Sequence, residues 1–83
     1  MTQVVLASHE NAPSGECAAV VAVIAAPTRM TAIQALRAAG FPAHKHSLTE
    51  PKPEDRAAAL TQPDVVLWRP WDAEPPYTYT RGT

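Results

Sequence analysis

Residues 18–26 form an unbroken apolar run (Ala-Ala-Val-Val-Ala-Val-Ile-Ala-Ala) that ends at Pro27. Periodicity alone does not distinguish a buried strand from a buried helix in such a run. Four β-branched residues within positions 20–24 favour a strand, and a strand without polar positions is one that is covered on both faces. Counted from Cys17 the run has ten residues, about half of what a membrane span needs, so we expect a soluble protein.

Residues 28–39 carry the clearest helix pattern in the chain. Thr31 and Gln34 fit a capping box at the helix start, Gly40 suits a left-handed C-terminal cap, and Pro42 prevents continuation. The apolar residues of the segment share one face of such a helix: Ala32, Ile33, Leu36 and Ala39.

The remaining elements are shorter. We expect strands at 2–8, 43–48 and 64–69, an edge strand at 77–80, and a second helix at 53–61 that begins at Pro53 with Glu54 and Asp55 in its first turn. Alternation of strands and helices argues for parallel pairing. The predicted fold is therefore a small α/β or α+β domain (1–83) in β-β-α-β-α-β order, with two helices on a three- to five-stranded, mostly parallel or mixed sheet.

A winged helix is the alternative fold. It requires residues 16–26 and 28–39 to form a helix pair, with 65–70 and 77–82 as the two strands of a wing that follows a DNA backbone. The thirteen residues 41–53 are too many for the turn of a helix-turn-helix motif, and the β-branched run forms helices poorly. The α/β fold is therefore favoured.

Two segments locally resemble response-regulator receiver domains: residues 36–41 (Leu-Arg-Ala-Ala-Gly-Phe) and 62–67 (Gln-Pro-Asp-Val-Val-Leu). Where that family places its phosphoacceptor aspartate, this chain has Trp68, Arg69 and Pro70, and no acidic pair follows Ile24. The resemblance therefore implies a shared α/β pattern and no phosphotransfer.

Charge and cysteine content exclude several classes of protein. The net charge of −1 lacks the basic surplus of a nucleic-acid binder. Cys17 is the only cysteine, so no internal disulfide forms, and the first sixteen residues contain no Lys or Arg, unlike a signal peptide. We expect a cytoplasmic protein that binds no membrane.

An amino-acid composition rich in Ala and Pro and poor in Lys is typical of a GC-rich genome, such as that of an actinobacterium or its phage.

Four of the five aromatic residues lie in the last sixteen positions: Trp68, Trp71, Tyr77 and Tyr79. Together with Arg69 and Arg81 they are the candidate partner-binding residues, and they lie in or immediately before an aromatic, Pro-rich segment at 70–83. Two interpretations stay open. The segment either closes an edge of its own sheet, with Trp68 under a helix, or pairs with another chain by β-augmentation or in a homodimer. The two arginines suit an acidic partner surface.

Other candidate sites are weaker. His44 and His46 point the same way in a strand, as metal ligands need, but no close-spaced Cys or His motif supports them, so we predict no metal site. Cys17 begins an apolar element and is expected to be a buried hydrophobe. A small-anion site at Thr28, Arg29 and Thr31 competes with plain helix capping.

We therefore predict a small protein without catalytic residues or cofactor, an adaptor or inhibitor that binds a protein partner or itself through the 70–83 segment. The alternative is a winged-helix DNA-binding regulator. No acid–base pair or activated nucleophile indicates an enzyme.

Overall fold

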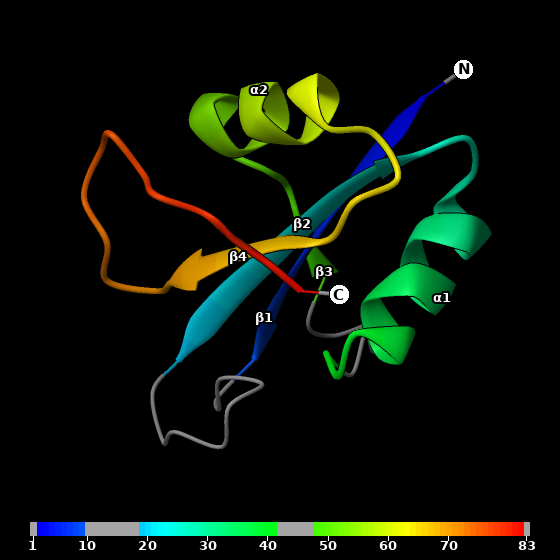
Figure 1. The fold of residues 1–83 in the computed structure, drawn as a ribbon, viewed down its shortest axis with the longest axis horizontal. Helices are drawn as coiled ribbons and strands as arrows, with labels where there is room; N and C mark the ends of the chain where they lie inside the picture. The colour runs from blue at the N-terminus through cyan, green and yellow to red at the C-terminus, as the bar shows by residue number, and fades with distance from the viewer. Residues whose placement is uncertain (1, 10–18, 42–47, 83) are drawn as a thin grey trace.

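The computed structural model describes residues 2–9, 19–41 and 48–82. Along the chain the elements are β1 (Gln3–His9), β2 (Val20–Ala26), α1 (Arg29–Ala38), β3 (Leu48–Thr49), α2 (Pro53–Thr61), β4 (Leu67–Pro70) and β5 (Thr80–Arg81) (Figure 1). Neither helix in these ranges has the length and apolar character needed to cross a bilayer.

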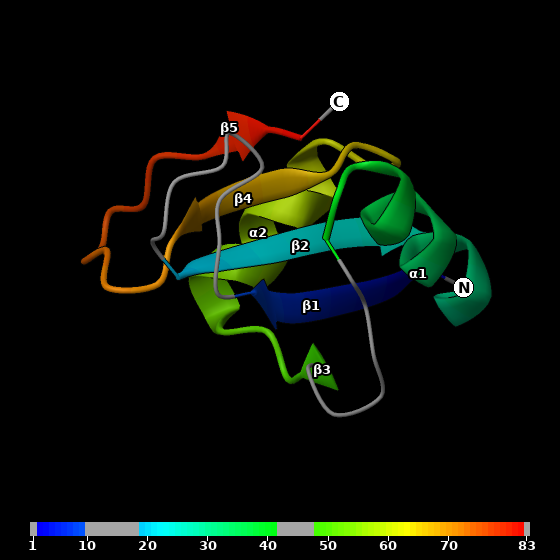
Figure 2. The same ribbon diagram turned by 90° about the horizontal axis from the view of Figure 1, so that it is seen from below.

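The described strands form one sheet in the order β3-β1-β2-β4-β5, and every neighbouring pair is antiparallel (Figure 2). The α+β class with two helices is thus confirmed, but the prediction of a mostly parallel sheet is wrong. The physical reason is that β1 lies inside the sheet and pairs with β2 along all seven residues. It separates β2 from β3, so the two same-direction strands joined by α1 are not neighbours.

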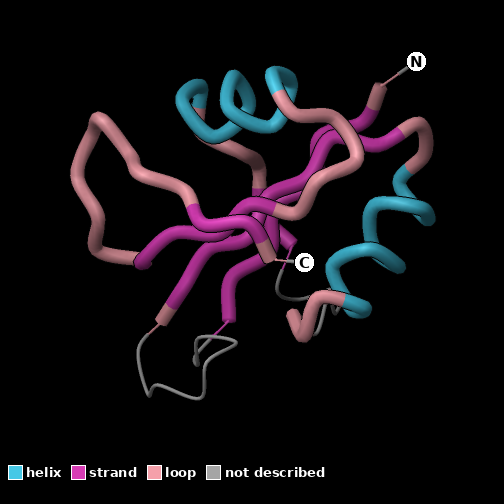
Figure 3. The backbone as a smooth tube through the Cα atoms, in the orientation of Figure 1, coloured by secondary structure: helices cyan, strands magenta, loops and turns pink. Residues whose placement is uncertain are grey.

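β2 is the central strand, and all seven of its residues are buried. The predicted strand is therefore present over residues 20–26, and the helix that the winged-helix alternative requires there does not form. The hairpin-like pairing of β4 with β5, which that alternative also expected, does exist. Complete burial of β2 follows from the two helices, which cover opposite faces of the sheet (Figures 1 and 3).

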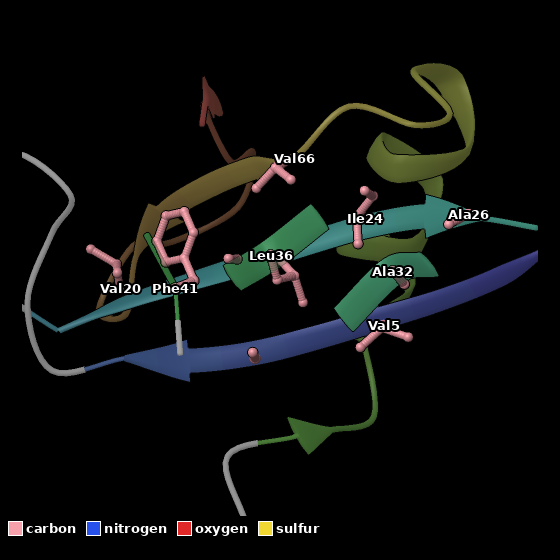
Figure 4. Close-up of a cluster of buried hydrophobic side chains, with 10 residues drawn as sticks. Val5, Val20, Ile24, Ala26, Ala32, Leu36, Phe41 and Val66 are labelled. Carbon is pink, nitrogen blue, oxygen red and sulfur yellow. The ribbon is translucent and has the colours of Figure 1, made fainter. Parts of the chain in front are cut away.

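Alternate side chains of the strands enter two separate hydrophobic layers. On one face, Val20, Ala22, Ile24 and Ala26 of β2 pack with Leu36 and Phe41 beneath α1 (Figure 4). On the other face, Val21, Val23 and Ala25 pack with Leu67 and with Ala59 of α2.

The ends of α1 are fixed by local hydrogen bonds. Thr28, not Thr31, is the N-cap: its Oγ1 accepts the backbone N–H of Thr31 at 3.1 Å. At the C-terminal end, the N–H of Gly40 donates to Arg37 O (3.0 Å) and that of Phe41 to Leu36 O (2.9 Å), which is a Schellman motif. Gly40 has φ 94°, the left-handed conformation predicted for it.

The other predicted elements agree in part. The second helix, with Pro53 in its first turn, is confirmed at Pro53–Thr61. The predicted strand 64–69 is shorter and later, at Leu67–Pro70, because residues 62–64 form a turn in which Asp64 has φ 66°. Most of the predicted strand 43–48 lies outside the described residues, and β3 comprises Leu48–Thr49. The edge strand expected at 77–80 is found at Thr80–Arg81.

The tight approach of Gly82 to the core yields a prediction. A Cβ atom at this position would lie 2.9 Å from Val66 Cγ1 and 3.3 Å from Phe41 Cε2. We expect Gly82→Ala to lower the free energy of unfolding by about 1–3 kcal/mol, since overpacking forces neighbouring side chains to shift. Urea denaturation followed by circular dichroism measures the change.

Val66→Ala provides the matched comparison, because it removes the methyl group that the new Cβ would meet. In the Val66→Ala background, Gly82→Ala is expected to cost clearly less than it does alone. Strict additivity of the two changes would contradict the proposed clash.

Candidate functional site

The aromatic side chains near the C-terminus fall into different environments. Trp68 is half-buried on the α1 face of the sheet, where it packs against the core. Tyr77 and Tyr79 are half-buried, and Tyr79 packs against the cluster beneath α2. Trp71 is 59% exposed. Only Trp71 therefore presents most of its side chain to solvent.

A buried ion pair joins α2 to β4. Asp55 is 0% exposed and Arg69 is 3% exposed. Arg69 Nε donates to Asp55 Oδ1 and its Nη2 donates to Oδ2, both at 2.8 Å, while Nη1 donates to the carbonyl of Pro70 at 3.1 Å. This two-pronged geometry is the strongest form of arginine–carboxylate contact. Because strand side chains alternate, Arg69 faces α2 whereas Trp68 faces α1.

Two tyrosines complete what we call the Asp55 network (Asp55, Arg69, Tyr77, Tyr79). The Tyr79 hydroxyl donates a hydrogen bond to Asp55 Oδ1. The Arg69 guanidinium lies over the Tyr77 ring, with Cζ 3.9 Å from the ring centroid, a cation–π contact. The two tyrosine rings meet edge to face, with centroids 6.2 Å apart. The network therefore holds the chain between β4 and β5 against α2.

Charge and burial shift the ionisation of these groups. Burial acts to raise the pKa of Asp55, but the hydrogen bonds from Arg69 and Tyr79 and the charge of Arg69 together prevail, so this pKa lies below its ordinary 3.8. The hydrogen bonds to Asp55 raise the pKa of Arg69. Burial, the hydrogen bond to Asp55 and its negative charge raise the pKa of the Tyr79 hydroxyl well above 10.0. At neutral pH Asp55 is thus a carboxylate, Arg69 a guanidinium cation and Tyr79 a neutral phenol.

Backbone hydrogen bonds also hold residues 71–82 in place. The N–H of Trp71 donates to Ala19 O at 2.9 Å, and that of Ala73 donates to Pro70 O at 3.3 Å. At the far end, the N–H of Gly82 donates to Val66 O at 2.7 Å. Between these attachments, residues 71–76 form a projecting loop, which we call the Trp71 loop (Figure 2).

The structure separates the predicted partner-binding residues. Arg69 is buried and paired with Asp55, so its guanidinium is not available to an acidic partner surface. Arg81 is exposed and donates from Nε to Gln62 Oε1 at 3.2 Å. Of the six residues, Trp71 combines large apolar area with exposure.

The weaker candidates are placed as follows. The Thr28 hydroxyl caps α1 and lies 2.8 Å from that of Thr31, so capping accounts for both threonines, whereas Arg29 is exposed. Cys17, His44 and His46 lie outside the described residues. Across residues 2–9, 19–41 and 48–82, no group of three His, Cys, Asp or Glu side chains is arranged to hold a metal ion.

Asp55 is not identified from the sequence as a site residue and is expected there only to interact with the helix dipole in the first turn of α2. Its position carries a usable indication, because it lies four residues before the buried Ala59 and therefore on the inward face of the helix. Arg69 lies two residues after Leu67, on the same face of β4. Opposite charges at two inward positions indicate a buried pair.

The ion pair is tested by removing one charge and then both. We expect Asp55→Asn to lower the free energy of unfolding by about 3–5 kcal/mol, because the Arg69 charge stays buried without its partner. Asp55→Asn with Arg69→Met leaves no buried charge and is expected to recover a large part of that loss. Urea denaturation at pH 7 compares the three proteins, and equal instability of the single and double variants would contradict the assignment.

The raised pKa of Tyr79 predicts a pH dependence. Neutral Tyr79 is the form that donates to Asp55, so its stabilising contribution is complete below the unfolded-state pKa of 10.0 and is lost as the pH rises above it. We expect Tyr79→Phe to cost about 1–3 kcal/mol at pH 8 and the difference from wild type to shrink above pH 10.0. Urea denaturation between pH 8 and 11, paired with tyrosinate absorbance, measures it. A difference that does not change with pH would refute the bond.

Comparison with known proteins identifies no relative of this chain. No family model matches the chain, and the searches of curated proteins and of solved structures find no match.

Proposed function

We propose that this protein is a small non-catalytic binding protein, of the adaptor or inhibitor type, that contacts a protein partner through the Trp71 loop. One observation carries the proposal: Trp71 is 59% exposed although its own backbone N–H is hydrogen-bonded to Ala19. Tryptophan is among the residues that dominate binding energy at protein interfaces. A cytoplasmic location is part of the proposal, since the single cysteine provides no internal disulfide.

Preorganisation supports the choice of this loop. Binding by a mobile segment loses affinity to the entropy of ordering it. At one end the Trp71 loop is hydrogen-bonded to Ala19, the residue before β2, and beyond the loop Tyr77 and Tyr79 hold the chain in the Asp55 network. The Trp71 side chain is therefore attached to a backbone that is held in place before a partner binds.

The charges of the loop suggest the partner's chemistry. Asp72 and Glu74 are both exposed, and no Lys or Arg occurs between Pro70 and Thr80. With Arg69 buried, the charged side chains that the loop itself exposes are acidic. The matching surface is an apolar pocket for the indole with a rim of Lys or Arg side chains.

Strand pairing is the less favoured route to a partner. β5 has two residues, Thr80–Arg81, and a short edge offers few backbone groups to another chain. Side-chain contact by Trp71 therefore ranks above β-augmentation or a homodimer built on this edge.

Trp71→Ala tests the proposal, with Met30→Ala as the control. Met30 is 63% exposed on α1, so both changes remove a large exposed apolar side chain. Affinity capture from the producing cells, followed by titration with each purified candidate, compares the variants. We expect Met30→Ala to bind as wild type does and Trp71→Ala to lose about 2 kcal/mol or more, roughly 30-fold in Kd.

Charge provides the second readout. The genuine partner is expected to bind more weakly as salt is raised, and Asp72→Asn with Glu74→Gln is expected to slow association and reduce this salt dependence. Equal weakening by Trp71→Ala and Met30→Ala would count against the loop. A concentration-dependent dimer that Trp71→Ala abolishes, seen by sedimentation velocity, would assign the loop to a second copy of the chain instead.

A further inference from the structure

A groove of about 340 Å³ opens at the β3 edge of the sheet, away from the Trp71 loop. The groove runs along the open edge of β1 at Val4 and Val5, whose side chains point to opposite faces of the sheet, and its rim is formed by residues 49–51. The topology explains the opening. β3 pairs with Leu6 and Ala7 and with no earlier residue of β1, because the chain leaves the sheet after Thr49 to begin α2 (Figure 2).

Two arginines from opposite faces of the sheet line this groove. Arg29 is the first residue of α1, and Arg56 lies in the first half of α2. Within the described part of the chain, neither guanidinium has a hydrogen-bond or ion-pair partner. Two cations that have no partner among the described residues are an arrangement that an oxyanion would stabilise.

Glu50 narrows the choice of ligand. This residue lines the same groove, as does Thr49. A negative charge beside the arginines disfavours multiply charged phosphates and offers an acceptor to a ligand hydroxyl or ammonium group. The volume lies at the lower end of the range for small-molecule sites.

We propose that this groove binds a small organic carboxylate that also bears a hydroxyl or ammonium group. The ligand carboxylate pairs with Arg29 and Arg56, its donor group pairs with Glu50, and its carbon skeleton lies along the edge of β1 at Val4 and Val5. The site is independent of the Trp71 loop. Val4 pairs with Ala25 near the end of β2, whereas Trp71 is bonded to Ala19 just before its start, roughly 20 Å away along the strand.

Backbone amide NMR of the ¹⁵N-labelled full chain tests the proposal with four probes: L-malate, L-glutamate, glutarate and inorganic phosphate. We expect saturable shifts at Val4, Val5 and Thr49 with L-malate or L-glutamate. Glutarate, which lacks the donor group, and phosphate are expected to bind more weakly. Glu50→Gln is expected to reduce the preference over glutarate.

Substituting the arginines distinguishes specific binding in this groove from nonspecific ionic attraction. Arg29→Gln and Arg56→Gln are each expected to weaken binding about tenfold or more, since each removes a charge-assisted contact. Arg81→Gln, which removes a positive charge at β5, is expected to leave ligand binding unchanged. Shifts that never saturate with any probe would overturn the proposal, as would equal effects of all three arginine variants or tighter binding of phosphate than of both donor-bearing acids.

Discussion

The buried ion pair between Asp55 and Arg69 is the contact on which the C-terminal part of the chain depends. Removing two charges from water is costly, and the cost is offset here by paired hydrogen bonds, the Tyr79 hydroxyl and the Tyr77 ring. A purely apolar contact would allow α2 to slide relative to β4. The directional bonds of the Asp55 network instead fix one position of α2, β4 and the following segment relative to each other.

Local elements of the fold could be predicted because their determinants are local. The β-branched run identifies β2, Gly40 ends α1, and Pro53 begins α2. Strand direction could not be predicted in this way. Alternating strands and helices give parallel neighbours only when no other strand intervenes, and the position of β1 between β2 and β3 is decided by packing of the whole chain.

The candidate site was predicted in composition but not in arrangement. The concentration of aromatic residues identifies the segment that forms the Trp71 loop and part of the Asp55 network, but it does not assign separate roles to the individual side chains. The structure divides them: Arg69 and the tyrosines hold the segment on its own sheet, while Trp71 remains exposed. Asp55 and Arg69 are fourteen positions apart, so their pairing depends on how α2 lies on β4, which no short sequence window contains.

The central position of β2 has a consequence for synthesis. Its partner on one side, β1, is made before it, but its partner on the other side, β4, follows some forty residues later. A nascent chain that has emerged only as far as α2 therefore exposes an open, wholly apolar strand edge, the kind that recruits neighbouring polypeptides. Translation pauses before residues 67–70 appear would prolong that state, so yield in the cell should depend on elongation rate and on chaperone supply.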